Sequence, residues 1–136
     1  MTGTELVALA REAMLCAYAP YSHHTVGAAL LGASGKVYLG CNIENAAYSP
    51  TCCAERVALF KAVSEGERAF SAIAIVGGMH GATASPCAPC GVCRQALREF
   101  CDPDALLILL GYDGGYDEYT LSELLPESFG PDHIKR

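Results

Sequence analysis

Apolar residues recur at the spacing of an amphipathic helix over the first eighteen positions. Thr2 and Glu5 precede this repeat with the three-residue spacing of a capping box. Pro20 cannot continue a helix, because it lacks a backbone N–H and its ring clashes with the preceding turn. The pattern therefore predicts a helix from about Thr4 to Tyr18, with an apolar face formed by Leu6, Ala10, Ala13, Met14 and Ala17.

Strand-like and helix-like patterns then alternate along the rest of the chain. The run at 69–76 is almost continuously apolar, as expected for a central strand that is buried on both faces. Interleaved strands and helices predict the α/β class, with one mixed sheet, helices on both of its faces, and 1–136 as a single domain. The expected strands are 25–31, 36–40, 69–76, 105–110 and 116–119. One further helix is expected from a cap at Ser49 or Thr51 to Gly66. Another begins near Gly91, and a short last helix covers 120–125.

Gly27, Ala28 and Ala29 are small for residues in a strand. Small residues at such positions indicate either that a helix packs closely over the strand or that a ligand approaches its backbone. Both explanations remain open at the level of the sequence.

Charge and cysteine content limit the classes of partner and the cellular compartment that the sequence allows. Nine Lys and Arg against fifteen Asp and Glu give a net charge of -6 without a basic cluster, which argues against a nucleic-acid partner. No apolar run is long enough to span a membrane, and 1–10 lack the pattern of a signal peptide. We therefore expect a reduced cytoplasmic protein, in which cysteines favour metal or redox chemistry over disulfides. A hydrophobic content of 51% is compatible with buried subunit contacts.

Two cysteine-containing segments carry the main candidate chemistry. Cys53-Ala54-Glu55-Arg56 and Pro89-Cys90-Gly91-Val92-Cys93-Arg94-Gln95 offer three thiols that could hold one metal ion. Three protein ligands around a tetrahedral Zn²⁺ leave a fourth position for water, which favours catalysis. Glu55 is then a candidate proton acceptor for that water. Arg56, beside Cys53, is a candidate for balancing the charge of three thiolates.

Asn42 and Glu44 form a second candidate group. If the chain stays extended after the strand at 36–40, residues two apart point to the same side. An amide and a carboxylate on one side can bind a sugar hydroxyl, which both donates and accepts a hydrogen bond. A solvated loop is the alternative interpretation of this pair.

Two other interpretations of the cysteines compete with catalysis. A structural zinc site in an interaction domain needs four protein ligands, and Cys52 or Cys87 could supply the fourth. A thiol redox site built on Cys90 and Cys93 is the other alternative, although it gives Cys53 no role.

At these motifs the chain resembles the small homotetrameric zinc-dependent cytidine deaminases. The resemblance implies a five-stranded mixed sheet between helical layers, Cys53, Cys90 and Cys93 as ligands of one Zn²⁺ per subunit, and Glu55 as proton shuttle. The matching segments are Tyr18-Ala19-Pro20-Tyr21-Ser22, Val26-Gly27-Ala28-Ala29, Cys41-Asn42-Ile43-Glu44-Asn45-Ala46-Ala47-Tyr48, Cys53-Ala54-Glu55-Arg56, Pro89-Cys90-Gly91-Val92-Cys93-Arg94-Gln95 and Glu123-Leu124-Leu125-Pro126.

The resemblance also implies a substrate and the residues that contact it. The expected reaction converts free cytidine and deoxycytidine to uridine and deoxyuridine with release of ammonia, as in pyrimidine salvage. Asn42 and Glu44 would bind the ribose 3′-hydroxyl, and Ala54 would be a further substrate contact. Phe129 occupies the position from which the family sends an aromatic ring into a neighbouring subunit's site.

The chain departs from the family pattern at two positions. His24 stands where the family usually has a phenylalanine that contacts the base, so a deaminase of a related aminopyrimidine nucleoside, such as blasticidin S, remains an alternative. Cys87-Ala88-Pro89-Cys90 offers a second register for the cysteine pair. We favour Cys90 with Cys93, because Arg94-Gln95 follow Cys93 as in the family pattern.

Overall fold

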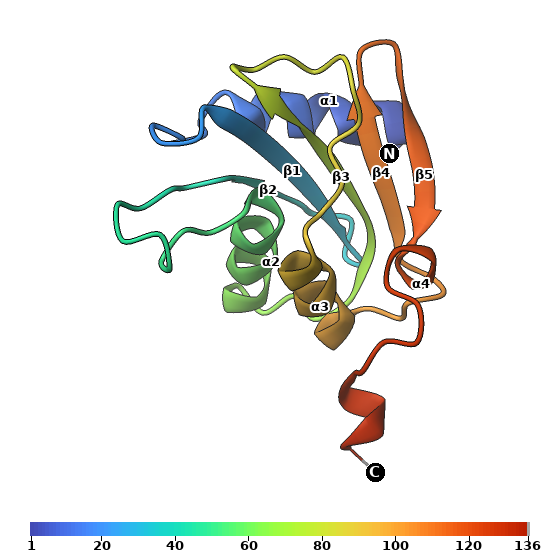
Figure 1. Ribbon diagram of the computed structural model, residues 1–136. Coiled ribbons are helices and arrows are strands. Elements are labelled where there is room, and N and C mark those ends of the chain that lie inside the picture. Colours follow the sequence, from blue (N-terminus) through green and yellow to red (C-terminus); the bar gives the residue numbers. More distant parts are fainter. Residues whose placement is uncertain (136) are drawn as a thin grey trace.

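The apolar patterns fold into five strands and four α-helices in the computed structural model, which describes residues 1–135 (Figure 1). The order of elements is the predicted one. The elements are α1 (Gly3–Met14), β1 (His24–Gly32), β2 (Val37–Cys41), α2 (Ala54–Ser64), β3 (Phe70–Met79), α3 (Gly91–Phe100), β4 (Leu107–Tyr112), β5 (Gly115–Thr120), α4 (Leu121–Leu124) and a 3-10 helix (Pro131–His133).

The five strands form one mixed sheet in the order β2-β1-β3-β4-β5. β1 pairs antiparallel with β2 and β3, β4 pairs antiparallel with β5, and β3 and β4 are parallel. The parallel pair requires a crossover, which α3 provides. The prediction that the apolar run at 69–76 is the central strand is confirmed.

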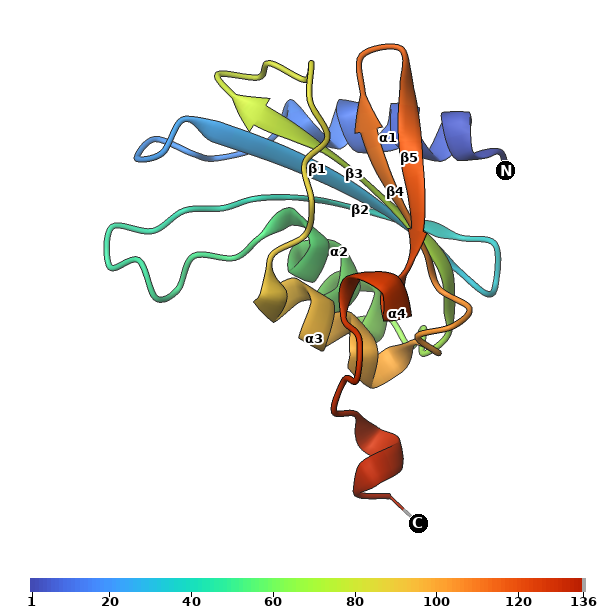
Figure 2. The ribbon, with the colours of Figure 1, turned by 45° about the vertical axis from the view of Figure 1, so that its right-hand side comes forward.

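Helices cover both faces of the sheet. α1 lies on one face, and α2 and α3 lie side by side on the other (Figures 1 and 2). Because side chains alternate along a strand, Ala29 and Ala74 pack under α1, while Leu30 and Ile73 face α2 and α3. Two apolar cores therefore hold three layers together, and the predicted α/β sandwich is confirmed.

Two glycines allow the helices to approach the sheet closely. A Cβ added to Gly27 would lie 2.1 Å from the carbonyl oxygen of Ala10 in α1. A Cβ added to Gly40 would lie 2.4 Å from the carbonyl oxygen of Ala54 at the start of α2. The small residues of β1 therefore reflect close helix packing, the first of the two explanations that the sequence allowed.

Two helix boundaries were predicted wrongly. α1 ends at Met14, four residues before Tyr18. The backbone N–H of Tyr18 instead donates to the carbonyl of Asn42, and its carbonyl accepts from Glu44, so this segment pairs with the extension of β2. α2 begins at Ala54 with Cys53 as N-cap, and the Thr51 hydroxyl accepts from the N–H of Asn45 rather than capping the helix.

The central strand is longer than its apolar run. β3 continues through Gly77 and Gly78 to Met79, because its pairing with β1 extends to His24. The other boundaries lie within two residues of the predicted ones, including the short last helix, whose Thr120–Glu123 capping box is present.

Candidate active site

The candidate metal ligands lie at the N-termini of two neighbouring helices. Cys53 is the N-cap of α2 and Cys90 is the N-cap of α3, both with extended backbone angles and without a side-chain capping bond. Cys93 lies in the first turn of α3 and is fully buried. Because helix N-termini carry partial positive charge, this position favours the thiolate form of a cysteine.

The three sulfur atoms have the spacing of a zinc site. The Sγ atoms of Cys53 and Cys90 are 3.8 Å apart, those of Cys90 and Cys93 are 3.5 Å apart, and all three lie within 4.8 Å of one another. Tetrahedral ligands with Zn–S distances of about 2.3 Å stand about 3.8 Å from each other. The donors therefore fit zinc, and the group does not include Cys87, the cysteine of the alternative register.

Arg56 contacts this cluster from α2. Its Nη2 lies 3.5 Å from the Sγ of Cys53. The hydrogen bond from the Cys93 thiol, followed by that from Arg56, lowers the pKa of Cys53. The pKa of Cys93 is raised in turn, because its thiol shares a hydrogen bond with Cys53 and is buried. The neighbouring cation thus favours the thiolate form of Cys53.

Glu55 brings a carboxyl group to the same place. It lies in the first turn of α2, is only 4% exposed, and lines a cavity together with Cys53 and Cys90. Burial raises the pKa of Glu55 to about 7, because the charged form loses its hydration. A carboxyl group with such a pKa exchanges protons readily at neutral pH, which is the property of a general acid and base.

The cavity measures about 260 Å³ and is lined by most of the candidate site residues predicted from the sequence. Asn42 and Glu44 both face it, as the extended-strand argument predicted, and so do His24 and Ala54. Cys52 and Cys87, the two cysteines that the structural-zinc alternative offered as a fourth ligand, also line it, and burial raises the pKa of the Cys87 thiol to about 11. The lining consists of Ser22, His24, Val26, Asn42, Glu44, Thr51, Cys52, Cys53, Ala54, Glu55, Cys87, Ala88 and Cys90.

The Asn42 amide is already partly occupied by β1. Its Oδ1 accepts from the N–H of Val26 at 2.9 Å, and its Nδ2 donates to the carbonyl of His24 at 2.7 Å. One lone pair and one N–H of the amide remain, so Asn42 retains one acceptor and one donor. β1 thus fixes the orientation in which the amide faces the cavity.

The Glu44 carboxylate is held by the turn that precedes β1. Its Oε1 accepts from the backbone N–H groups of Tyr21 and Ser22 at 3.0 and 3.1 Å, and its Oε2 accepts from the Ser22 hydroxyl at 2.5 Å. These bonds, chiefly that of the Ser22 side chain, lower the pKa of Glu44. Ser22 was not identified as a site residue from the sequence, because its pairing with Glu44 depends on how two separate loops meet.

Phe129 does not line the cavity of its own chain. The residue is 59% exposed, and its ring stacks on His133 with centroids 5.3 Å apart. Gln95 of α3 donates to its carbonyl at 2.8 Å, and Arg98 of α3 pairs with Asp132 at 2.6 Å. The helix that carries Cys93 therefore also fixes the C-terminal segment.

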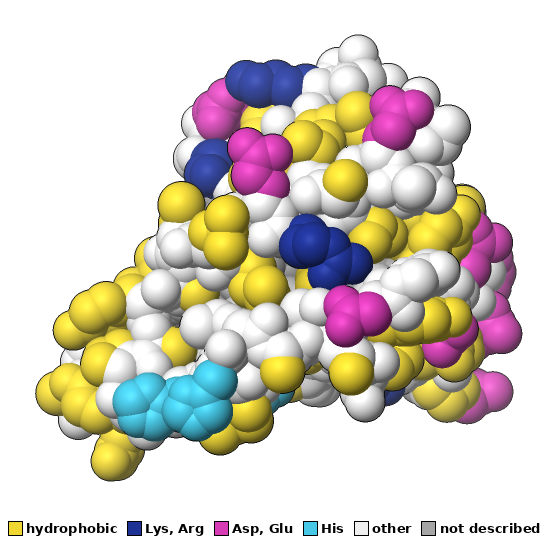
Figure 3. Space-filling model, turned by 90° about the horizontal axis from the view of Figure 1, so that it is seen from above, with side chains coloured by type: hydrophobic (Ala, Val, Ile, Leu, Met, Phe, Trp, Pro, Cys, Tyr) yellow, Lys and Arg dark blue, Asp and Glu magenta, His cyan; other side chains and the backbone are white. Residues whose placement is uncertain are grey.

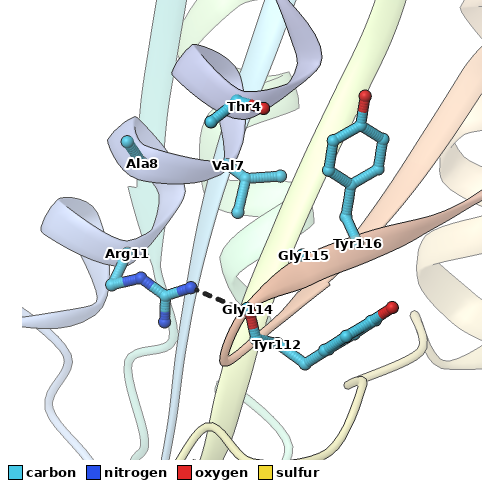
Figure 4. A pocket seen from close by; sticks show the side chains of 8 residues that line it. All are labelled: Thr4, Val7, Ala8, Arg11, Tyr112, Gly114, Gly115 and Tyr116. Carbon is cyan, nitrogen blue, oxygen red and sulfur yellow. Dashed lines mark hydrogen bonds between the residues drawn. The ribbon is translucent and has the colours of Figure 1, made fainter.

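A larger cavity of about 500 Å³ lies on the other face of the sheet, between α1 and the turn joining β4 to β5 (Figure 4). Arg11 is its cationic group, and its guanidinium already donates to the carbonyl of Tyr112 at 3.3 Å and to the Thr83 hydroxyl at 3.1 Å. The lining contains neither cysteine nor carboxylate. The smaller cavity beside the three sulfurs is therefore the candidate active site.

The charge distribution on the surface and the apolar character of the helices also bear on the sequence predictions about partners. On the face shown in Figure 3, cationic side chains stand singly among acidic and neutral ones and form no basic patch. None of the helices within residues 1–135 combines the length and the apolar character needed to cross a bilayer.

The fold and the site together define an α/β metalloenzyme with a three-cysteine centre beside a buried carboxyl group. The family described as the cytidine and deoxycytidylate deaminase zinc-binding region matches residues 2–109. A cytidine deaminase of Sporosarcina psychrophila is 47% identical over 130 residues, covering 96% of this chain and 93% of the relative. One from Halalkalibacterium halodurans is 50% identical over 124 residues, with 91% of each chain covered.

Solved structures agree with these sequence relatives. The crystal structure of a cytidine deaminase from Burkholderia pseudomallei superposes with a TM-score of 0.86 at 45% identity, covering 95% of this chain and all of that one. A cytidine deaminase structure from Mycobacterium tuberculosis reaches a TM-score of 0.80 at 39% identity, with 96% and 98% of the two chains covered. The chain belongs to the zinc-dependent cytidine and deoxycytidylate deaminase family.

Proposed function

We propose that the chain catalyses the hydrolytic deamination of cytidine and deoxycytidine to uridine and deoxyuridine, with Cys53, Cys90 and Cys93 holding one Zn²⁺ per subunit. The observation that carries this proposal is that the three-sulfur cluster and the buried carboxyl of Glu55 meet at one cavity. The names of the relatives, which share about half of their residues with this chain, support the same reaction.

Glu55 moves the protons in this proposal. When bound, zinc supplies a Lewis acid that lowers the pKa of a water molecule and orients it. Glu55 accepts a proton from the attacking water and delivers it to N3 of the base as oxygen bonds to C4. It then transfers the second water proton to the exocyclic amine, which leaves as ammonia. The product keeps the N3 proton, and both protons of the water are accounted for.

The other cavity residues bind and orient the nucleoside. The free donor and acceptor of Asn42 and the ionised carboxylate of Glu44 suit the 3′-hydroxyl of a ribose or deoxyribose. Ala54 and His24 are the proposed contacts for the base. Arg56, through its hydrogen bond to Cys53, offsets negative charge on the sulfurs that would hold the metal.

An assay with matched variants tests the reaction. Zinc-loaded protein is incubated with cytidine, deoxycytidine and blasticidin S while ultraviolet absorbance and ammonia release are followed. The Glu55→Gln variant should bind zinc like the wild type, since Glu55 is not a proposed ligand, and lose nearly all turnover. Wild-type kcat in this variant would refute the role of Glu55, and turnover of blasticidin S alone would favour the alternative that His24 leaves open.

We also propose that four subunits assemble so that each Phe129 ring enters a neighbouring subunit's site. The exposed ring, its fixed backbone and its position outside its own cavity support this arrangement. Light scattering should report a tetramer. Phe129→Ala should raise KM for cytidine in that tetramer, whereas a monomeric wild-type protein with full activity would contradict the proposal.

The proposed setting is pyrimidine salvage in the cytoplasm, with 1–136 as one catalytic domain acting on free nucleosides. The eight unpaired cysteines of the structure and the net charge of -6 support a reducing compartment and a small substrate rather than a nucleic acid. Equal kcat/KM for cytidine and for a short cytidine-containing RNA would contradict this choice of substrate.

A further inference from the structure

The Glu44 carboxylate has little acceptor capacity left for a ligand. A carboxylate offers about four lone-pair positions, two on each oxygen. The N–H groups of Tyr21 and Ser22 use both positions on Oε1, and the Ser22 hydroxyl uses one on Oε2. One position on Oε2 therefore remains for a donor in the cavity that Glu44 lines.

The Ser22 hydroxyl has a fixed direction. Its oxygen accepts from the backbone N–H of His24 at 3.0 Å, while its proton is donated to Oε2 of Glu44 at 2.5 Å. A hydroxyl that is bound on both sides cannot rotate without breaking one of the two bonds. One side chain thus connects Glu44 to the backbone of His24, and both residues line the cavity.

These bonds define which carboxylate oxygen is presented to a ligand. Without the Ser22 hydroxyl, the two backbone donors still hold Oε1, but nothing fixes Oε2 about the carboxylate axis or limits it to one open position. The lowered pKa of Glu44 keeps the group ionised, so it accepts hydrogen bonds and donates none. A ligand must therefore bring a hydroxyl or amine, and its direction must match the remaining position.

We propose that Ser22 is a positioning residue for substrate selection: its hydroxyl fixes Glu44 so that a single acceptor is aimed at the sugar 3′-hydroxyl. This inference rests on the proposed function, because it assigns the free position of Glu44 to the sugar of the nucleoside. In this role Ser22 acts through its hydrogen bond to Glu44, and it is not assigned a contact with a reacting atom.

The test compares cytidine with 3′-deoxycytidine, which lacks the hydroxyl in question. The wild type should prefer cytidine in kcat/KM by at least about tenfold, the effect of one hydrogen bond to a charged group. Ser22→Ala should lower kcat/KM for cytidine by about tenfold, mainly through KM, and leave 3′-deoxycytidine almost unchanged. The preference should therefore nearly disappear in the variant, an effect that general loss of structure would not produce.

Four variants serve as controls, three single and one double. Ser34 lies in the turn between β1 and β2 and donates a similar hydroxyl bond to Glu67, so Ser34→Ala should keep the wild-type preference. Ser22→Thr retains a hydroxyl at the exposed position and should restore the preference. Glu44→Gln should abolish the preference, and adding Ser22→Ala to it should have no further effect on the ratio, as required of residues that act as a unit.

The possible outcomes distinguish the proposed reaction, the contact of Glu44 with the 3′-hydroxyl and the role of Ser22. Absence of cytidine turnover in the wild type overturns the proposed function itself. A wild type that treats both nucleosides alike overturns the assignment of Glu44 to the 3′-hydroxyl. The role of Ser22 is overturned if the wild type prefers cytidine and Ser22→Ala keeps this preference. It is also overturned if Ser22→Ala loses activity equally on both nucleosides. If Ser22→Ala does not fold, Ser22→Gly and Ser22→Thr decide between the same results.

Discussion

Replacing Gly40 with alanine should impair catalysis as well as stability. The added Cβ would lie 2.4 Å from the carbonyl oxygen of Ala54 and 2.6 Å from the amide nitrogen of Ala58, whereas ordinary contact begins near 3.4 Å. The start of α2 must therefore move away from β2 by about 1 Å. Because Glu55 follows Ala54, the carboxyl moves as well, and a misplacement of this size costs about 100-fold in rate. Overpacking itself costs about 1–3 kcal/mol.

Gly27→Ala is the matched control on the opposite face of the sheet. Its added Cβ would lie 2.1 Å from the carbonyl oxygen of Ala10 and 2.4 Å from the amide nitrogen of Met14, a clash at least as severe. The displaced helix is α1, which carries none of the proposed catalytic residues. We expect a similar loss of stability from Gly27→Ala, with less than about a fivefold change in kcat/KM, because only α2 transmits the displacement to Glu55.

The assay combines cytidine turnover, zinc content and urea unfolding at one protein concentration, because the stability of an oligomer depends on concentration. Zinc content must be measured, since movement of α2 also affects Cys53, its N-cap. An equal loss of kcat/KM in Gly27→Ala and Gly40→Ala would show that displacement of α2 is not what impairs catalysis. A destabilised Gly40→Ala variant that turns over cytidine at the wild-type rate would show the same.

Three further predictions concern the metal cluster and the substrate. Cys93→Ala should lose most of its zinc while Cys87→Ala keeps one equivalent, as measured by metal analysis after gel filtration; the reverse would favour the alternative register. Arg56→Gln should retain zinc but lower kcat by about tenfold, because the negative charge on Cys53 is no longer offset; an unchanged kcat would contradict this role. Cytidine 3′-phosphate should have a kcat/KM at least about 100-fold below that of cytidine, since the phosphate repels Glu44, and equal values would exclude the assigned contact.

Features that depend on neighbouring residues could be predicted from the sequence. The capping box of Thr120 and Glu123 needs residues three apart, and the common orientation of Asn42 and Glu44 follows from the two-residue period of an extended chain. The buried character of the central strand is visible in a single apolar run. For the same reason, Gly27 indicated close packing, although its sequence context alone did not distinguish a helix from a ligand.

Features that depend on long-range pairing could not be predicted. α1 ends early because Tyr18 bonds to Asn42, a residue on another segment, and helix periodicity contains no information about that competition. Thr51 has the chemistry of an N-cap, but its hydroxyl accepts from the N–H of Asn45 in the loop that follows β2, which leaves Cys53 as the cap. The bond between Ser22 and Glu44 has the same character, since it joins two loops that only the completed sheet brings together.

The sulfur cluster is divided between two helices, and this division affects the stage of folding at which zinc can bind. Cys53 and Cys90 are 37 positions apart, and the central strand lies between them in the chain. A metal joining them would close a loop of that length, which by the relation for cross-links removes about 4 kcal/mol of unfolded-chain entropy. Zinc uptake should therefore come late, after the crossover has formed, and the time course of metal capture during refolding would report assembly of the whole tertiary structure.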